Sequence, residues 1–303
     1  MSNNPPLLSI CIPTYNRADY LKGALENITS DPAFDNSVEI VISDNASTDN
    51  TYEVVHEYCS KYDNILYFRN KENVRDKNFF LALSRANGKY VRLFNDTLRF
   101  SEGKLQRMLE IISQADDSKG LFLFNDSAHT IVQNKCVKTT NINSFLNHVS
   151  YNITWIANFG CWKSDLMLFD NPERYSSLQL SQVDWFLHLT SQRSSVYVYF
   201  DGWFNSIPPL HKGGYNLFKV FVDNYLLILK RYRVSFVVFE IEKYRLFRYF
   251  VLSWLLRIHY DTNNRFTFIT NDKWWILLKH YWGCPYFYIG IFYYKFKTLF
   301  FTK

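Results

Sequence analysis

Apolar runs that end in polar clusters alternate with helical patterns through the first half of the chain. These runs predict buried strands at residues 7–13, 38–42, 65–68, 90–94 and 121–124. Helices are predicted between them, at residues 19–28, from the second polar loop to about 61, at 78–86 and at about 103–113. This alternation is typical of a mostly parallel sheet wrapped by helices, so we expect an α/β fold.

The second apolar run, residues 38–42, stops abruptly at a polar segment, residues 43–50. A buried strand, a polar loop and a helix are how an α/β nucleotide site is usually built, because ligands bind beyond the carboxyl ends of the strands. Asp44 follows the strand, where its carboxylate can accept hydrogen bonds from a base or a ribose. The alternative is that these acids only cap the helix or form the turn. We favour that alternative for Asp49 and a functional role for Asp44.

Polar residues also follow the neighbouring predicted strands. Thr14 and Tyr15 come after the first strand, Arg75 after the third and Asp96 after the fourth. No GxGxxG follows the first strand, and GxxxxGK[ST] does not occur in the sequence. The sequence therefore predicts a nucleotide site of neither the dinucleotide type nor the P-loop type.

Composition limits the class of protein. The chain has 303 residues, of which 48% are hydrophobic, so we expect one large domain with an appendage, or two domains. Its five cysteines are scattered without a CxxC pair, which indicates neither a disulfide framework nor a zinc site. A reducing cytoplasm is the default location. The first residues lack a basic segment ahead of an apolar one and do not predict a signal peptide.

Charge is unevenly distributed along the chain. The net charge is +6, but residues 211–303 hold 15 Lys and Arg against 5 Asp and Glu, which leaves the remainder mildly acidic. Basic residues in this last third are interleaved with Trp, Tyr, Phe and Leu, a pattern that favours an anionic membrane surface over nucleic acid. The apolar run at residues 249–256 is too short to span a bilayer.

Three motifs in residues 7–110 resemble the nucleotide-binding half of family 2 glycosyltransferases, which have the GT-A fold. They are the segments 9–17 (SICIPTYNR), 41–51 (VISDNASTDNT) and 73–78 (NVRDKN), the last leading to 86–90 (ANGKY). The loop lengths are most similar to those of enzymes that assemble bacterial O-antigen or capsule units, in the abequosyltransferase-like branch. We expect two parts: a GT-A domain at residues 1–210, which the resemblance implies, and a helical, membrane-associating region at residues 211–303, which the charge pattern favours.

The resemblance also implies roles for individual residues. Thr14 and Tyr15 would touch the nucleotide, Asp44 would hold the base, and Arg75 would reach the base or the phosphates. Asp96 would belong to the DxD-type motif, which binds ribose and a divalent cation, Mg²⁺ or Mn²⁺, that bridges the diphosphate.

The DxD-type motif departs from the family pattern, because Asp96 is the one carboxylate in the segment 94–98 (FNDTL). We expect a cation. The alternatives are a site in which Arg and Lys replace the metal, or one that has lost catalysis.

We expect the second half of the chain to bind the acceptor. Asp184, at the start of a predicted helix, resembles the general base of inverting members, which must lie within hydrogen-bond reach of the acceptor hydroxyl. It could equally serve the helix dipole. His211 and Lys212 lie in a glycine-rich basic loop that can close over a diphosphate or simply link two domains. Aromatic residues at 155–162 can line an acceptor site or fill the core.

The predicted function is transfer of a sugar from a nucleoside diphosphate sugar to a lipid-linked glycan, at the inner face of the plasma membrane. A degenerate GT-A module that binds a nucleotide sugar or glycan without transfer is the first alternative. A basic peripheral membrane or nucleic-acid protein without sugar chemistry is the weaker one. For residues 211–303, the alternative to membrane docking is a helical cap on the catalytic domain.

Overall fold

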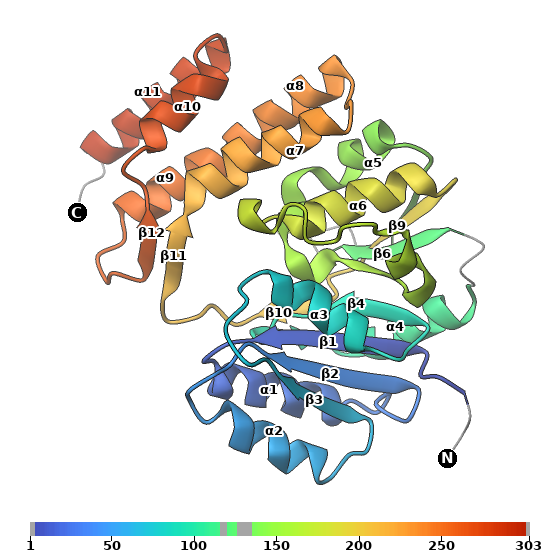
Figure 1. Cartoon of the computed structure of the whole chain (residues 1–303). Coiled ribbons are helices and arrows are strands. Elements are labelled where there is room, and N and C mark those ends of the chain that lie inside the picture. The colour runs from blue at the N-terminus through green and yellow to red at the C-terminus, as the bar shows by residue number, and fades with distance from the viewer. Residues whose placement is uncertain (1–3, 116–119, 126–134, 301–303) are drawn as a thin grey trace.

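The computed structural model describes residues 4–115, 120–125 and 135–300. A five-stranded sheet lies at its centre in the order β3-β2-β1-β4-β8 (Figure 1). Its strands are β1 (Leu8–Thr14), β2 (Val38–Asp44), β3 (Ile65–Arg69), β4 (Tyr90–Leu93) and β8 (Gly160–Trp162). The first four are parallel to one another, and β8 runs antiparallel to β4 at the edge. The predicted α/β fold is therefore confirmed.

Helices cover both faces of this sheet, as its sequence requires. Every residue of β2 is buried, which fits a parallel strand covered on both faces. On β1, Ile10 and Ile12 pack in one apolar cluster with α1 (Ala18–Thr29), whereas Cys11 packs in the other cluster with α3 (Lys77–Arg85). The other helices beside this half are α2 (Thr51–Cys59) and α4 (Lys104–Ser113).

A buried carboxylate fixes the turn that leads into β4. Glu39 accepts hydrogen bonds from the Ser9 hydroxyl at 2.6 Å and from the Asn87 backbone N–H at 2.8 Å. Gly88 lies against β1 so closely that a Cβ would be 2.5 Å from Ser9 Oγ and 2.8 Å from its backbone nitrogen. The turn therefore requires glycine, and it sets where β4 begins beside β1.

Smaller sheets and short helices follow the central sheet in the chain. Strand β6 (Leu121–Asn125) does not extend that sheet; it pairs with β9 (Val196–Phe200), which also pairs with β7 (Lys135–Thr139). Strands β5 (Leu98–Phe100) and β10 (Phe204–Ser206) pair with each other. The helices here are α5 (Ile142–Val149) and α6 (Ser181–Gln192), with 3₁₀ turns at Ser150–Thr154, Ile156–Asn158, Lys163–Leu168 and Ser176–Leu178.

The C-terminal third is helical, as predicted, except for one strand pair. Strand β11 (Lys212–Asn216) pairs with β12 (Phe266–Ile269), so the segment predicted as a flexible loop is partly a strand. The helices are α7 (Tyr225–Arg231), α8 (Phe236–Arg245), α9 (Leu252–His259), α10 (Lys273–Tyr281) and α11 (Pro285–Phe300), with π-helical turns at Lys219–Asn224 and Leu246–Val251. Within residues 4–115, 120–125 and 135–300, no helix has the length and apolar character needed to cross a bilayer.

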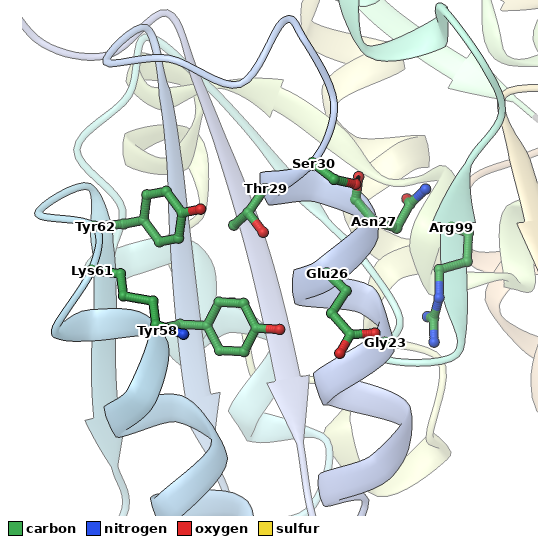
Figure 2. Close-up of a pocket in the computed structure, with 9 residues that line it drawn as sticks. All are labelled: Gly23, Glu26, Asn27, Thr29, Ser30, Tyr58, Lys61, Tyr62 and Arg99. Carbon is green, nitrogen blue, oxygen red and sulfur yellow. Dashed lines mark hydrogen bonds between the residues drawn. The ribbon is translucent and has the colours of Figure 1, made fainter.

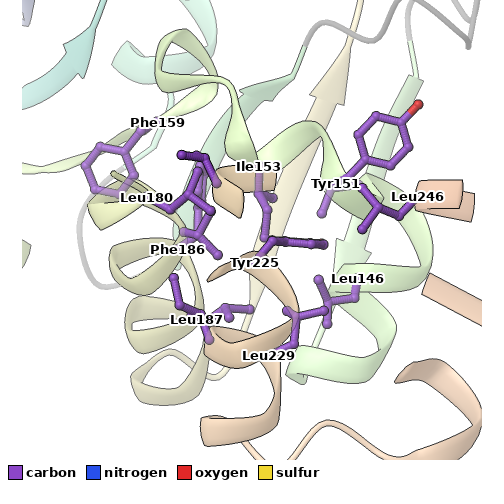
Figure 3. Close-up of a cluster of buried hydrophobic side chains, with 14 of the residues drawn as sticks. Leu146, Tyr151, Ile153, Phe159, Leu180, Phe186, Leu187, Tyr225, Leu229 and Leu246 are labelled. Atoms are coloured by element: carbon purple, nitrogen blue, oxygen red, sulfur yellow. The ribbon is translucent and has the colours of Figure 1, made fainter. Parts of the chain in front are cut away.

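The C-terminal helices share a core with the rest of the molecule. Phe186 and Leu187 of α6 lie in the same buried cluster as Tyr225 and Leu229 of α7 (Figure 3). The cluster continues to Tyr294 of α11. The inner side of this region thus packs as a cap on the body. The division into parts at residue 210 remains a prediction.

Glu242 of α8 joins the cap to the body through polar contacts within this core. Its carboxylate accepts hydrogen bonds from the Ser150 hydroxyl at 2.7 Å and from the Tyr225 hydroxyl at 2.8 Å. Burial raises the pKa of Glu242 to about 7. The folded protein therefore keeps a proton that the unfolded chain loses near its ordinary pKa of about 4.3. Raising the pH through this interval must lower the stability.

We predict that the free energy of unfolding falls by about 1–3 kcal/mol between pH 5 and pH 8 because Glu242 must ionise in the core. Glu242→Gln should remove most of this fall, as measured by urea unfolding across that pH range. Glu240→Gln is the matched control, because Glu240 is partly exposed and pairs with Lys243 at 3.0 Å. Parallel pH profiles for wild type and Glu242→Gln would contradict the assignment.

Candidate active site

The parallel strands bring three of the predicted site residues to one edge of the sheet. Thr14 and Asp44 are paired across β1 and β2, and Asp96 follows shortly after β4 on the other side of β1. The Thr14 hydroxyl donates a hydrogen bond to Asp96 Oδ2 at 3.1 Å. The structure therefore brings these three residues to one edge of the sheet, and their roles in binding stay predictions.

Asp96 is buried, with 3% of its surface exposed, and it is held by two groups on the β1 side. One is Thr14; the other is Arg17, whose Nη1 donates to Asp96 Oδ1 at 3.2 Å. Burial raises the pKa of the Asp96 carboxyl, against the opposing effect of Arg17 and of the Thr14 hydrogen bond. Arg17 was not among the predicted site residues, although it is the cation that ends the first motif.

Asp44 is fixed by its neighbours as well as placed at the strand end. Its Oδ1 accepts a hydrogen bond from the Ser47 backbone N–H at 2.9 Å, which closes the turn. Its Oδ2 accepts one from the Tyr67 hydroxyl at 2.7 Å, and Arg69 Nε lies 3.8 Å from the same oxygen. Burial and the hydrogen bond to Asp44 raise the pKa of Tyr67. Asp44 therefore does form the turn, as the alternative interpretation predicts. Its binding of the base stays a prediction.

Asn45 ties the third predicted loop to this edge. Its amide donates to Asn73 Oδ1 at 2.8 Å, and its oxygen accepts from the Val74 backbone N–H at 2.9 Å. Arg75 follows with φ of 54°, in the left-handed region, and its side chain is exposed. Tyr15, on the first loop, is also largely exposed. Both side chains are therefore accessible to a ligand at the strand ends.

Asp76 is a candidate that the sequence did not single out. Burial raises its pKa to about 6, against the lowering effect of Arg75. Burial raises the pKa of Tyr215 on β11, the charge of Asp76 adds to this rise, and Arg17 opposes it. Tyr215 is therefore close enough to the strand ends for charged groups there to influence it.

Lys212 belongs to the same side of the molecule. Its Nζ lies 5.3 Å from the centre of the Trp254 ring. Surrounding atoms partly desolvate the Lys212 ammonium and lower its pKa, although the residue as a whole is exposed, and the like charges of Arg257 and Arg17 lower it further. His211, the other basic residue predicted in this segment, is exposed just before β11. Lys212 is therefore close enough to Arg17 for the two like charges to influence each other, and His211 lies at the surface beside it.

Asp184 lies in the first turn of α6, in an ion pair. Arg174 donates to it from Nε at 2.8 Å and from Nη2 at 2.7 Å, and the Tyr232 hydroxyl donates to Oδ1. Hydrogen bonding to Asp184 raises the pKa of Arg174, and burial and the same carboxylate raise that of Tyr232. These contacts join α6 to α7, and among the described residues none of them links Asp184 to the strand ends. Its role as general base stays a prediction.

The protein supplies few free oxygen ligands for a divalent cation beside Asp96, although the side-chain oxygen of Asn95 is buried without a hydrogen-bond partner among the described residues. Within the described parts of the chain, no three His, Cys, Asp or Glu residues lie together as a metal-binding group. Both oxygens of Asp96 already accept hydrogen bonds, and one of the donors is the positively charged Arg17. A hard cation prefers several oxygen ligands and would here be placed beside a guanidinium. The positive charge paired with Asp96 is that of Arg17.

A hollow of about 630 Å³ lies elsewhere, on the outer side of α1 and α2 (Figure 2). Arg99 and Glu26 line it, together with Tyr58 and Tyr62. The Arg99 side chain packs against α1 at Gly23, where a Cβ atom would lie 2.1 Å from Arg99 Nη2. None of the predicted site residues lines this hollow, so we assign it no part in the site.

Solved structures with a similar fold bind nucleotide sugars. The Staphylococcus aureus protein TarS, residues 1–349 in complex with UDP-GlcNAc, aligns with 83% of this chain and 76% of its own at 16% identity, with a TM-score of 0.61. A Pyrobaculum calidifontis mannosyltransferase in complex with GDP-Man and Mn²⁺ covers 100% of this chain and 89% of its own at 14% identity, with a TM-score of 0.52. At these identities the likeness concerns the fold alone. The chain has the GT-A fold of nucleotide-sugar transferases.

Comparison of the sequence with known proteins points to one family of glycosyltransferases. Residues 9–151 match the profile of Glycosyl transferase family 2. Abequosyltransferase RfbV of Salmonella typhimurium is 44% identical over 115 residues, which are 36% of this chain and 34% of that protein. The GalNAc(5)-diNAcBac-PP-undecaprenol beta-1,3-glucosyltransferase of Campylobacter jejuni is 31% identical over 107 residues, 35% of this chain and 34% of that one.

Residues 9–151 are therefore similar to glycosyl transferase family 2, in agreement with the predicted resemblance. The aligned stretches span about a third of the length of RfbV and of the Campylobacter protein.

We predict that Arg174→Met lowers the free energy of unfolding by about 1–3 kcal/mol, because it leaves the buried Asp184 carboxylate without its bidentate partner. Urea unfolding at neutral pH measures this. Arg231→Met is the matched control, since Arg231 lies 4.8 Å from the centre of the Tyr175 ring and has no carboxylate partner among the described residues. Equal losses in the two variants would contradict a specific role for the Arg174–Asp184 pair.

Proposed function

We propose that this chain transfers a sugar from a nucleoside diphosphate sugar to a lipid-linked glycan acceptor during synthesis of a bacterial surface polysaccharide such as O-antigen or capsule. The observation that carries the proposal is the convergence of Thr14, Asp44 and Asp96 at one edge of a GT-A sheet. The family match over residues 9–151 supports it.

The donor would bind across the ends of β1, β2 and β4. In this proposal Asp44 accepts hydrogen bonds from the base, and Thr14 and Tyr15 touch the nucleotide. Arg75 is exposed on the neighbouring loop and can approach the base or the phosphates. The diphosphate gains negative charge as it leaves, and a fixed cation lowers the energy of that state. Arg17 would supply this charge, with His211 and Lys212 on the segment that flanks it.

The acceptor hydroxyl would be deprotonated by Asp184. Its oxygen then forms a bond to the anomeric carbon on the face opposite the diphosphate, the bond from that carbon to the phosphate oxygen breaks, and the configuration inverts. Asp184 keeps the proton, and the nucleoside diphosphate leaves with the bonding electrons. For this step the hydroxyl must replace a hydrogen bond that Arg174 or Tyr232 now makes to the carboxylate.

A lipid-linked acceptor and a peripheral place on the inner face of the plasma membrane complete the proposal. The name of the Campylobacter jejuni relative describes an acceptor on an undecaprenol carrier, and the similarity to that protein supports the same class of acceptor here. The excess of basic and aromatic residues after residue 210 agrees with an anionic surface.

The second candidate function is binding without transfer. Asp96 is the one carboxylate in its motif, and Arg17 and Thr14 occupy both of its oxygens. Such a site could hold a nucleotide sugar and lack turnover. A panel of nucleoside diphosphate sugars with membrane extract as acceptor separates the two functions. Binding of a donor without any product across the panel would favour the second.

We predict that Asp44→Ala, Asp96→Ala and Asp184→Ala each lower the rate of transfer by about a hundredfold or more, because Asp44 and Asp184 would contact donor and acceptor and Asp96 holds Arg17 in place. Radiolabelled sugar transfer into the lipid fraction measures this. Asp63→Ala, on the exposed turn before β3, should retain wild-type turnover. If Asp96→Ala and Asp184→Ala both keep near wild-type turnover, the assigned roles are wrong.

The cation that the family resemblance predicts has its own test. Because the residues around Asp96 do not fit a held metal, we expect binding of the nucleoside diphosphate to change less than about threefold between EDTA and millimolar Mg²⁺ or Mn²⁺. Arg17→Gln should instead weaken it about tenfold or more. Calorimetric titration with UDP, GDP, CDP and dTDP measures both. A loss of all binding in EDTA with little effect of Arg17→Gln would restore the cation to the site.

A further inference from the structure

The outer side of α10 carries exposed rings beside a lysine. Trp275 and Trp282 are 75% and 70% exposed, and Leu278 between them is 44% exposed. These positions and Lys279 are spaced i, i+3, i+4 and i+7, so they form one stripe along the helix. Tryptophan at this exposure is unusual for a surface that meets only water, because its large apolar area is normally covered.

α11 continues this surface with an apolar outer side of its own. Its inner side packs on the cap through Phe287 and Tyr294, and a Cβ at Gly290 would lie 2.5 Å from the Phe247 ring. The helix is thus held tightly against the body. Its outward side chains are nevertheless apolar: Ile289, Phe292, Phe296, Leu299 and Phe300 are all exposed, Phe292 by 73%. Both sides of α11 are therefore apolar, but only its inner side packs against the described part of the protein.

A basic hollow of about 510 Å³ lies between α8 and α10, next to the stripe. Lys230, Lys243, Lys279 and His280 line it, and the rings of Phe236 and Phe239 form apolar parts of its wall. Lys279 belongs both to the hollow and to the exposed stripe, which makes the two surfaces contiguous.

The charges in this hollow are only partly balanced. Lys243 pairs with Glu240 at 3.0 Å, and Lys279 and His280 share Asp223 at 2.6 and 2.7 Å. Lys230 makes no ion pair within the described residues, and its Nζ lies 5.6 Å from the centre of the Phe239 ring. Burial lowers the pKa of His280; Asp223 opposes this change, and the nearby charges of Lys279 and Lys230 add to it. Positive charge is therefore concentrated here beside exposed rings.

We propose that α10, α11 and the hollow between α8 and α10 form a docking surface for an anionic phospholipid bilayer. Rings at the level of the headgroups, with lysines directed to phosphates, are the chemistry of an interfacial helix. The hollow would take a lipid phosphate, and the outward residues of α11 would enter the boundary with the acyl chains. The charge excess after residue 210 gives the surface its complementarity to anionic lipid.

The position of this docking surface relative to the strand ends is compatible with the proposed function. β11 runs from the donor side into the helical region, and Figure 1 shows α10 and α11 at the far end of the molecule from α1 and α2. A bilayer on α10 and α11 would leave the strand ends accessible to soluble donor. Only the identity of the acceptor rests on the proposed function; the docking itself does not.

The test is co-sedimentation of the full chain with vesicles of phosphatidylglycerol and phosphatidylethanolamine, compared with pure phosphatidylcholine. We expect binding to the anionic vesicles and binding to phosphatidylcholine that is weaker by about tenfold or more. Binding to the anionic vesicles should be lost in about 0.5 M salt, because salt screens the lysine–phosphate contacts. Trp275→Ser/Trp282→Ser/Phe292→Ser should weaken binding about tenfold or more, and so should Lys230→Gln/Lys279→Gln. The control Lys22→Gln/Lys71→Gln alters two exposed lysines on the opposite half and should bind as wild type.

Each variant is also checked by calorimetric nucleotide titration and by sedimentation velocity. Wild-type nucleotide binding shows that a variant is folded. Equal vesicle binding by the wild type and by Trp275→Ser/Trp282→Ser/Phe292→Ser would overturn the proposal. It would also be overturned if the wild type were a dimer that bound no vesicles and that this variant converted to a monomer. Vesicle binding without sugar transfer would overturn the proposed function alone, whereas transfer to a detergent-solubilised acceptor without vesicle binding would overturn the docking surface alone.

Discussion

The parallel pairing of β1 with β2 on one side and β4 on the other is the constraint on which the rest of the structure depends. It forces the carboxyl ends of three strands to one edge, so that residues far apart in sequence meet there. The hydrogen bond from Thr14 to Asp96, which spans 82 positions, is the direct consequence. The buried Glu39 and the glycine at 88 help to set this pairing, because they fix where β4 begins beside β1.

Basic groups continue from that edge toward the C-terminal third. Arg17 pairs with Asp96, and desolvation together with the like charges of Arg257 and Arg17 lowers the pKa of Lys212 on β11. The same third packs its inner side into the core of the body and leaves an apolar, basic outer side. In the proposed function, the polar edge would bind the soluble nucleotide sugar and the distant outer side would meet the lipid that carries the acceptor.

Sequence patterns were sufficient for the four parallel strands of the sheet and for the residues at their ends, but they did not predict the antiparallel edge strand β8. Buried parallel strands are continuous apolar runs, and Thr14, Asp44 and Asp96 come directly after such runs. The pairing of Arg17 with Asp96 and of Arg174 with Asp184 could not be predicted, because it depends on side chains that only the fold brings together. The aromatic residues at 155–162 are a mixed case: Phe159 and Trp162 are buried, so most of that cluster fills core beside the short edge strand β8.

The most direct measurement is a crystal structure of the chain with the nucleoside diphosphate that binds it most tightly. The account predicts the base within hydrogen-bond distance of Asp44 and the diphosphate within hydrogen-bond distance of Arg17, both at the carboxyl edge of β1, β2 and β4. A nucleotide found in the hollow on α1 and α2, or at any place that leaves Thr14, Asp44 and Asp96 untouched, would contradict it.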